Sequence, residues 1–164
     1  SIKIGIEEGA TMESAENPFT HRIAIWGSSY THGSCTSRAG MTYPAQFSRS
    51  TGLQLLSLGC SGRCLLQDYF CDVLVDVDAE AFIFDSFSNP RATMIRERLV
   101  PFIDRMIAAH PGKPLIFQQT IYREKRNYNT QEADKEQAKC SFSYSVRNSV
   151  CLCQSSRSWP TRTS

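Results

Sequence analysis

Two serines follow an apolar run of the chain, in a position suited to nucleophilic chemistry. Residues 22–26 form this run, and Ser28 and Ser29 come just after it. A serine hydroxyl attacks an ester carbonyl once a base takes its proton, and the oxyanion that forms needs hydrogen-bond donors fixed in advance. Gly59 and Asn89 follow two later apolar runs and offer such donors, a backbone N–H and a side-chain amide.

The elements that must position these residues alternate between strands and helices. Strands are predicted at 22–26, 53–58, 81–87 and 115–121, where continuous apolar runs are typical of parallel strands covered on both faces. Helices are predicted at 42–51, at 65–77, in a segment ending near 109, and from 132 to 139. This alternation predicts an α/β fold: a three-layer α/β/α domain with a mostly parallel, flavodoxin-like sheet of four to five strands. The carboxyl ends of such strands share one edge, so Ser28 or Ser29, together with Gly59 and Asn89, are expected to meet there.

Apolar spacing assigns an inward face to two of these helices. In the helix at 65–77 the inward residues are expected to be Leu66, Phe70, Val73, Leu74 and Val77. In the helix ending near 109 they are expected to be Leu99, Phe102, Ile103, Met106 and Ile107. Pro101 interrupts this second helix and is expected in a first turn or at a kink.

Composition narrows the possible classes of protein. The chain has 164 residues, of which 41% are hydrophobic and 21% charged, with a formal net charge of +2. This length suits one domain with a hydrophobic core, and the weak charge favours neither nucleic-acid binding nor a membrane surface. No apolar run is long enough to span a bilayer, and no signal peptide is visible. The first strand is not followed by a glycine-rich phosphate loop, which argues against a nucleotide-binding protein.

The cysteines predict neither a metal site nor a disulfide framework. There are seven of them: Cys35, Cys60, Cys64, Cys71, Cys140, Cys151 and Cys153. An odd number cannot pair completely, and the spacings lack the paired short steps of a zinc site. Buried thiols, or one or two incidental disulfides, are expected, and no metal or other cofactor.

The two ends of the chain differ from its middle. Residues 1–21 contain one short alternating piece at 2–6, which predicts a lead-in strand and a linker, or the tail of an upstream domain. Residues 140–164 are rich in Ser, Arg and Cys, contain no Asp, Glu or His, and follow no regular period. Two interpretations of this anomalous tail stay open: a surface tail, or a change of reading frame near Cys140.

The order of the motifs resembles the SGNH (GDSL-type) hydrolase family over about 23–139. Gly27-Ser28-Ser29-Tyr30-Thr31-His32-Gly33 is similar to the family's first block, with Ser29 as the nucleophile. Leu58-Gly59-Cys60-Ser61-Gly62 and Asp85-Ser86-Phe87-Ser88-Asn89 are similar to the next two blocks, whose glycine and asparagine hold the oxyanion. The segment 38–44 resembles the Gly-x-x-Tyr-Pro stretch of a bacterial branch in which a small β-rich domain precedes the hydrolase domain. The resemblance therefore implies a hydrolase domain over 22–139, and a secreted or periplasmic location.

The chain departs from the family pattern at two places. Ser28 stands where the first block usually has Asp, Asn or Thr. The last block, an Asp and a His three residues apart, is missing: no Asp follows Asp134 and no His follows His110. His32 is too near Ser29 in sequence for good base geometry, while His21 and His110 are expected to face solvent on the far side of the domain.

Two residues near the blocks also have a structural interpretation. Asn89 precedes Pro90 and could instead cap the following helix. Asp85 is expected to be a structural carboxylate at a strand end rather than a catalytic one.

The resemblance implies a serine ester hydrolase that works through an acyl-enzyme. Its expected substrates are small acyl esters, including acetyl groups on carbohydrates, and its expected catalytic residues are Ser29, Gly59 and Asn89. Loss of the catalytic histidine implies impaired activity of this chain. The alternative is a non-catalytic module that binds a small molecule or carbohydrate at the same edge. No nucleic-acid or membrane partner is expected.

Overall fold

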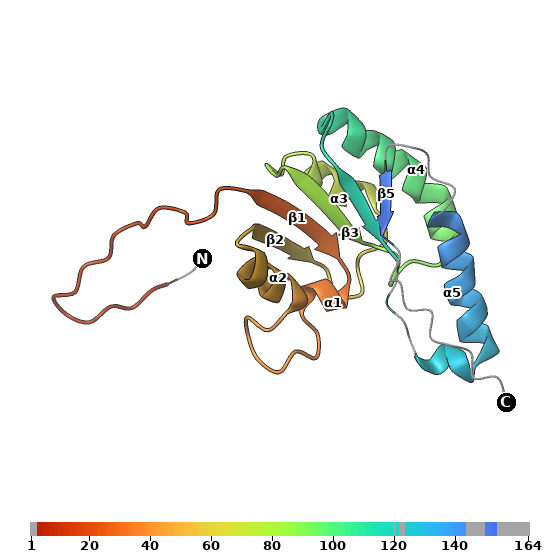
Figure 1. Cartoon of the computed structure of the whole chain (residues 1–164), viewed down its shortest axis with the longest axis horizontal. Helices are drawn as coiled ribbons and strands as arrows, with labels where there is room; N and C mark the ends of the chain where they lie inside the picture. The colour runs from red at the N-terminus through yellow and green to blue at the C-terminus, as the bar shows by residue number, and fades with distance from the viewer. Residues whose placement is uncertain (1–2, 120, 122–123, 144–149, 154–164) are drawn as a thin grey trace.

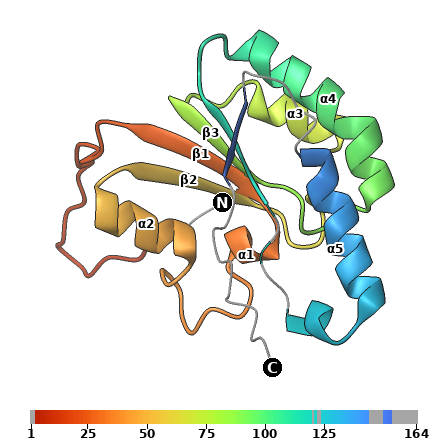
Figure 2. The same cartoon turned by 45° about the vertical axis from the view of Figure 1, so that its right-hand side comes forward.

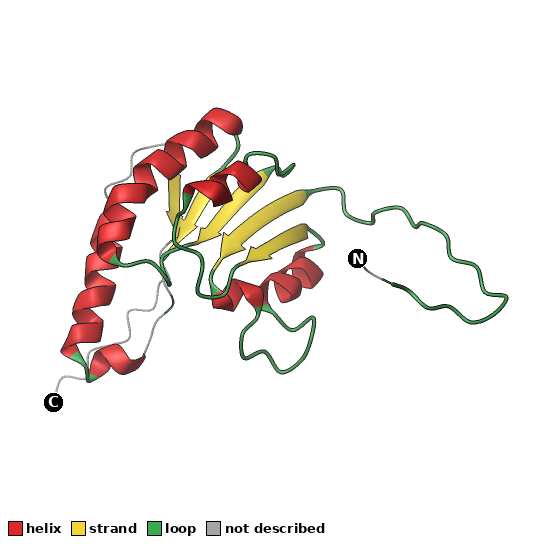
Figure 3. Ribbon diagram, turned by 180° about the vertical axis from the view of Figure 1, so that it is seen from behind, coloured by secondary structure: helices red, strands yellow, loops and turns green. Residues whose placement is uncertain are grey.

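A five-stranded parallel sheet with helices on both faces forms the domain (Figures 1 and 3). The computed structural model describes residues 3–119, 121, 124–143 and 150–153. The strands are β1 (Arg22–Gly27), β2 (Gln54–Gly59), β3 (Ala81–Asp85), β4 (Leu115–Gln118) and β5 (Val150–Cys153). The helices are α1 (Ser29–His32), α2 (Tyr43–Thr51), α3 (Asp68–Leu74), α4 (Ala92–Ala109) and α5 (Thr130–Ser143), with a 3₁₀ turn, η1, at Glu124–Asn127. The predicted three-layer α/β/α class is confirmed.

The strand order β2-β1-β3-β4-β5 places β1 between β2 and β3. All four pairings are parallel. Gly27 at the end of β1 is level with Gly59 of β2 and with Asp85 of β3. The three strands that precede the candidate site residues therefore end at the same height.

Local sequence signals explain the bounds of α2. The Thr42 hydroxyl accepts a hydrogen bond from the Ala45 N–H at 3.2 Å, which caps the first turn. Pro44 lies in that turn, where its missing N–H costs nothing. Gly52, at φ +71°, ends the helix in the left-handed conformation. The predicted helix at 42–51 is thus confirmed within one residue.

Aromatic rings fill the core between the sheet and helices α3 and α4. Trp26 stacks on Phe102 with ring centroids 5.3 Å apart. Phe84 stacks on Phe117 at 4.5 Å and meets Phe102 edge-on at 5.4 Å. These residues are at most 1% exposed, so the central strands are joined to α4 by ring contacts.

The inward faces predicted for two helices are partly wrong. Leu66 is buried, but it precedes α3 and has φ +55°, so the loop rather than the helix places it in the core. Val73 of α3 and Ile107 of α4 are 58% and 40% exposed. In each helix, fewer residues pack against the sheet than the spacing of its apolar residues suggests. Pro101 lies inside α4 rather than in a first turn.

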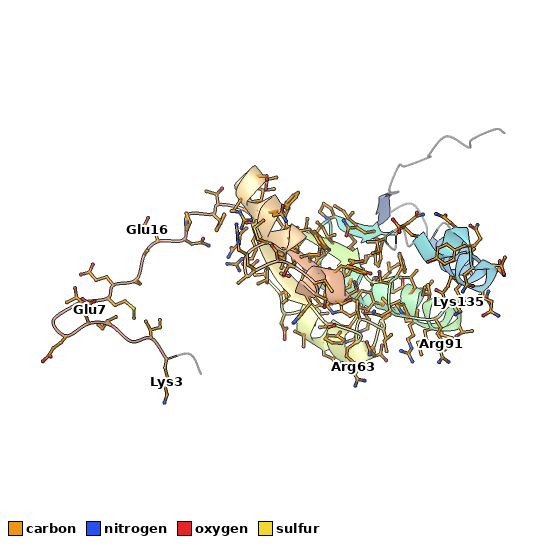
Figure 4. All side chains as sticks on the ribbon, turned by 90° about the horizontal axis from the view of Figure 1, so that it is seen from below. Lys3, Glu7, Glu16, Arg63, Arg91 and Lys135 are labelled. Carbon is orange, nitrogen blue, oxygen red and sulfur yellow. The ribbon has the colours of Figure 1, made fainter. Side chains whose placement is uncertain are left out.

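The N-terminal segment extends away from the domain (Figures 1 and 4). Residues 3–21 contain no strand, and Ile4 and Ile6 are 65% and 55% exposed. The predicted lead-in strand is therefore wrong over these residues, since no neighbouring strand pairs with them. Lys3, Glu7 and Glu16 mark this segment in Figure 4.

The C-terminal segment contains more regular structure than expected. Its first residues, 140–143, complete α5, and Val150–Cys153 form β5, which pairs in parallel with β4. The absence of a period across 140–164 therefore does not exclude regular structure at these residues. A four-residue apolar strand is too short to show a period. Residues 144–149 and 154–164 lie outside the described part, and the reading-frame hypothesis stays a prediction.

No helix among the described residues is long and apolar enough to cross a membrane.

Thiol reactivity is expected to follow burial. Cys35 is exposed, whereas Cys64 and Cys71 are fully buried. Burial, reinforced by the charges of Asp68 and Asp72, raises the pKa of Cys71 to about 11. At pH 8 about 0.1% of that thiol would be thiolate, the reactive form.

With iodoacetamide at pH 8, Cys35 is therefore expected to alkylate at least about a hundred times faster than Cys64 or Cys71. Peptide mass spectrometry measures the rates, and denatured chain, in which all three react, is the control. Equal labelling of Cys71 and Cys35 in the native chain would contradict this.

Candidate active site

Ser29 begins α1, a single helical turn at the carboxyl end of the sheet (Figure 2). Ser28 is the residue that caps this turn, and its hydroxyl accepts from the Tyr30 N–H at 3.4 Å. Ser29 is half-buried, but Ser28 is fully buried with its hydroxyl committed to Asp85. Ser29 is thus the serine of the pair that can meet a substrate.

A buried carboxylate lies beneath the turn. Asp85 is 3% exposed, and its Oδ2 accepts from Ser28 Oγ at 2.8 Å and from Thr31 Oγ1 at 2.9 Å. The Tyr43 hydroxyl lies 2.8 Å from Thr31 Oγ1. Burial, and to a lesser degree the charge of Asp85, raises the pKa of Tyr43, so this phenol stays protonated.

Gly59 touches the backbone of α1 directly. A Cβ at position 59 would lie 2.2 Å from the His32 nitrogen and 2.7 Å from the Thr31 carbonyl carbon. The His32 Nδ1 donates to the Gly59 carbonyl at 3.1 Å, and the Cys60 N–H donates to the Gly27 carbonyl at 2.8 Å. Only glycine lets the end of β2 approach the turn so closely.

Asn89 follows β3 with its amide oxygen buried. Neither that oxygen nor the Ser86 hydroxyl has a hydrogen-bond partner among the described residues. The residue that caps α4 is Arg91, not Asn89, and it makes no side-chain cap bond. The helix-capping interpretation of Asn89 is therefore wrong, and its amide is not committed to α4.

The three predicted site residues gather at one edge of the sheet. Ser29, Gly59 and Asn89 follow or end β1, β2 and β3, whose ends are level in the register. Their assignment as nucleophile and oxyanion donors stays a prediction, but the topology brings them to the place where α/β sheets bind ligands.

The three histidines differ in environment. His32 is exposed on α1, and His21 is exposed at the other end of the sheet, 2.9 Å from Glu80. His110 was expected to face solvent, but it is 6% exposed: its Nε2 donates to the Leu74 carbonyl at 3.0 Å. Its ring also packs on Phe82 at 4.3 Å, because the turn after α4 folds back onto the core.

A polar hollow of about 150 Å³ lies at the opposite edge of the sheet. Arg22 and Gln54, the first residues of β1 and β2, line it together with His21 and Glu80. It is thus separated from Ser29 by the length of the strands. No group of three or more His, Cys, Asp or Glu side chains that could hold a metal ion occurs within the part of the chain that the structure describes.

Sequence reasoning did not anticipate Thr31 and Tyr43 as parts of this site. The sequence interpretation of Asp85 as a structural carboxylate does not include its contacts with Ser28 and Thr31. The available signal was the level ending of neighbouring parallel strands, which brings the first residues after one strand next to the last residue of another.

Comparisons with known proteins agree with the fold and with the motif order. The family model for the GDSL-like lipase/acylhydrolase family matches residues 20–154. A structure described as a GDSL-like lipase from Bacteroides ovatus is 32% identical, with a TM-score of 0.81 over 91% of this chain and 47% of that one. The salicylyl-acyltransferase SsfX3 of a tetracycline biosynthetic pathway is 21% identical, with a TM-score of 0.69 over 95% of this chain and 48% of that one.

A family two carbohydrate esterase from Cellvibrio japonicus shares the fold at 15% identity, with a TM-score of 0.63 over 85% of this chain and 53% of that one. A search of curated proteins finds no match. The chain spans about half the length of these three structures. The family match covers most of the 164 residues and includes β5, so the chain belongs to the GDSL-like lipase/acylhydrolase family.

Proposed function

We propose that this domain cleaves small acyl esters through an acyl-enzyme on Ser29. The observation that carries the proposal is the gathering of Ser29, Gly59 and Asn89 at one sheet edge, with Ser28 buried. In the proposed step, Ser29 Oγ attacks the ester carbonyl and loses its proton to a base. The N–H groups of Ser29 and Gly59 and the Asn89 amide then donate to the oxyanion. When this intermediate collapses, the bond to the alcohol oxygen breaks, the alcohol leaves with the proton, and the acyl group stays on Ser29.

Acetyl groups on carbohydrates are the substrates that we favour within this class. The support is similarity of fold to a structure named as a carbohydrate esterase. A second neighbour is named as an acyltransferase, which also fits an acyl group held on the enzyme. An acyl-enzyme serves both reactions, because water or another hydroxyl can accept the acyl group.

The base is the missing component of the proposed mechanism. Of the three histidines in the sequence, only His32 lies at the edge with Ser29, and its Nδ1 is bonded to the Gly59 carbonyl. We therefore expect slow turnover by these 164 residues. The oxyanion donors alone would sustain a residual rate, as in serine hydrolases whose triads have been disrupted.

Covalent labelling tests the nucleophile. A fluorophosphonate is expected to modify Ser29, and Ser29→Ala is expected to abolish both the labelling and any hydrolysis of p-nitrophenyl acetate. Ser34→Ala removes an exposed hydroxyl just beyond α1 and is the matched control, with labelling kept. Mass spectrometry identifies the modified residue. Labelling that persists in Ser29→Ala would overturn the assignment.

A binding module on the same fold is the second candidate, because the sheet edge with Ser29, Gly59 and Asn89 could hold a ligand without chemistry. It predicts that acetylated oligosaccharides bind equally well to the unaltered chain and to Ser29→Ala, and that the fluorophosphonate labels neither. Calorimetry together with labelling separates the two functions.

A further inference from the structure

A single side chain, Asp85, connects the turn that carries the nucleophile to the strand before the amide donor. It lies at the end of β3, four residues before Asn89 in the sequence. Its Oδ2 accepts from the two hydroxyls that flank Ser29, those of Ser28 and Thr31. Ser29 is thus held on both sides by one buried oxygen atom.

The turn needs such support because it is too short to be stable alone. Helix α1 has four residues, and the His32 N–H to Ser28 carbonyl bond, at 3.0 Å, closes its single turn. One isolated turn fixes several backbone dihedrals in exchange for very few hydrogen bonds and does not persist in water. The Asp85 Oδ2 atom accepts two hydrogen bonds from this turn, one from its capping residue Ser28 and one from Thr31, so one acceptor ties both ends of α1 to β3.

The direction of the hydrogen bonds is fixed by the number of protons. The Thr31 hydroxyl has one proton, and the acceptor-only carboxylate of Asp85 takes it. Tyr43 must therefore donate to Thr31 Oγ1, giving a chain from Tyr43 through Thr31 to Asp85. Every donor in this chain points toward the carboxylate, so no rearrangement within it releases α1.

Close packing fits the carboxylate to the turn. A Cβ at position 27 would lie 2.8 Å from the Asp85 Cβ and 2.1 Å from Thr31 Oγ1. Gly27 thus leaves room for β3 and α1 to meet across β1. A second support comes from β2, where the Ser57 hydroxyl donates to the Thr31 carbonyl at 3.2 Å.

We propose that Asp85 is a positioning residue that holds Ser29 in its attacking position by accepting hydrogen bonds from Ser28 and Thr31. The inference rests on the proposed function of Ser29. In this role, the Asp85 oxygen holds α1 in place as a hydrogen-bond acceptor, and the residue does not touch the substrate. An amide oxygen in the same place should therefore serve nearly as well.

Two replacements of Asp85 test this. Asp85→Ala removes the acceptor, and Asp85→Asn keeps one. In Asp85→Ala the amides of His32, Gly33 and Ser34, which bond to the Ser28 and Ser29 carbonyls, are expected to exchange hydrogen at least about tenfold faster. In Asp85→Asn they are expected to stay within about threefold of the unaltered chain. Asp104→Ala, on the exposed side of α4, is the control and should change nothing at α1.

The fluorophosphonate labelling rate of Ser29 is the second measurement. It is expected to fall at least about tenfold in Asp85→Ala and to recover in Asp85→Asn. If the hydrogen-exchange rates at α1 are unchanged in Asp85→Ala, the proposal is overturned. It is also overturned if these amides exchange faster while the labelling rate of Ser29 does not fall, because that result indicates a purely structural role. If Asp85→Asn behaves like Asp85→Ala, the charge rather than the acceptor matters and the proposal is wrong. If the unaltered chain is never labelled, the proposed function fails while hydrogen exchange still decides whether Asp85 holds the turn.

A gentler pair of variants applies if Asp85→Ala does not fold. Thr31→Val has nearly the same shape as threonine and removes one of the two donors, whereas Thr31→Ser keeps it. Thr31→Val is expected to speed exchange at α1 at least about threefold, and Thr31→Ser to leave it unchanged. Equal exchange in the two variants would refute the role of Asp85.

Discussion

Replacing Gly59 with alanine is expected to lower the free energy of unfolding by about 3 kcal/mol or more. The added Cβ would lie 2.2 Å from the His32 nitrogen and 2.5 Å from its Cα. These are backbone atoms of α1, so no side-chain rotation can relieve the clash. Either β2 or the nucleophile turn must move, and Ser29 labelling should fall with it. Urea denaturation measures the loss.

Gly62→Ala is the matched control for this change, because it lies three residues later, in the turn that follows β2. Its φ is +69°, but nothing lies within 4 Å of the added Cβ. Only backbone strain is therefore expected, at about 1–2 kcal/mol. If Gly59→Ala costs no more than Gly62→Ala, the contact between β2 and α1 is not as tight as described.

The second large effect is expected in the core. Phe84→Ala should destabilise the domain by about 3–5 kcal/mol, the usual range for a buried phenylalanine. Phe84 is 0% exposed, lies on the central strand β3, and contacts the rings of Phe102 and Phe117. Its removal leaves a cavity between the sheet and α4 that these large rings cannot fill.

Tyr128→Ala gives the comparison for the loss of an aromatic ring. Tyr128 is 78% exposed, so its removal should change the free energy of unfolding by less than about 0.5 kcal/mol. Both variants are measured by urea denaturation with the same signal. A loss below about 1 kcal/mol in Phe84→Ala would show that the aromatic cluster is not the core of the domain.

The sheet was predictable chiefly from β1 and β3, whose apolar residues are buried or half-buried. The runs near β1 and β3 are apolar throughout, and no helix pattern competes with them. Helix α2 was equally predictable, since Thr42, Pro44 and Gly52 are local signals that act without help from the rest of the chain. Where sequence and structure agree, the signals that determine the element lie within a few neighbouring residues.

Where they disagree, distant contacts decide. Leu66 is buried by a left-handed loop conformation that its apolar character does not reveal. His110 is buried because it finds the Leu74 carbonyl and the Phe82 ring. The strand at Val150–Cys153 forms by pairing with β4, and four residues among serines and arginines give no pattern of their own.

The candidate site was likewise predictable only in part. The edge at which Ser29, Gly59 and Asn89 gather followed from the alternation of strands and helices alone, which predicts a parallel sheet. The buried state of Ser28 and its bond to Asp85 did not, because they depend on two strands ending at the same height. No sequence motif supplies the base that the proposed mechanism needs, so the fold could be predicted further than the chemistry.

The hydrogen bonds around Ser29 also set the order in which this site can form during synthesis. Strand β1 and helix α1 emerge from the ribosome before the residues that support them. Ser57 lies 26 positions after Thr31, and Asp85 lies 57 positions after Ser28. Until β3 has emerged, the turn has no carboxylate to hold it, and a nascent chain that stalls before Asp85 carries Ser29 on an unanchored segment. Ser29 is therefore made early in the domain, but its turn is fixed in place only after β3 has emerged.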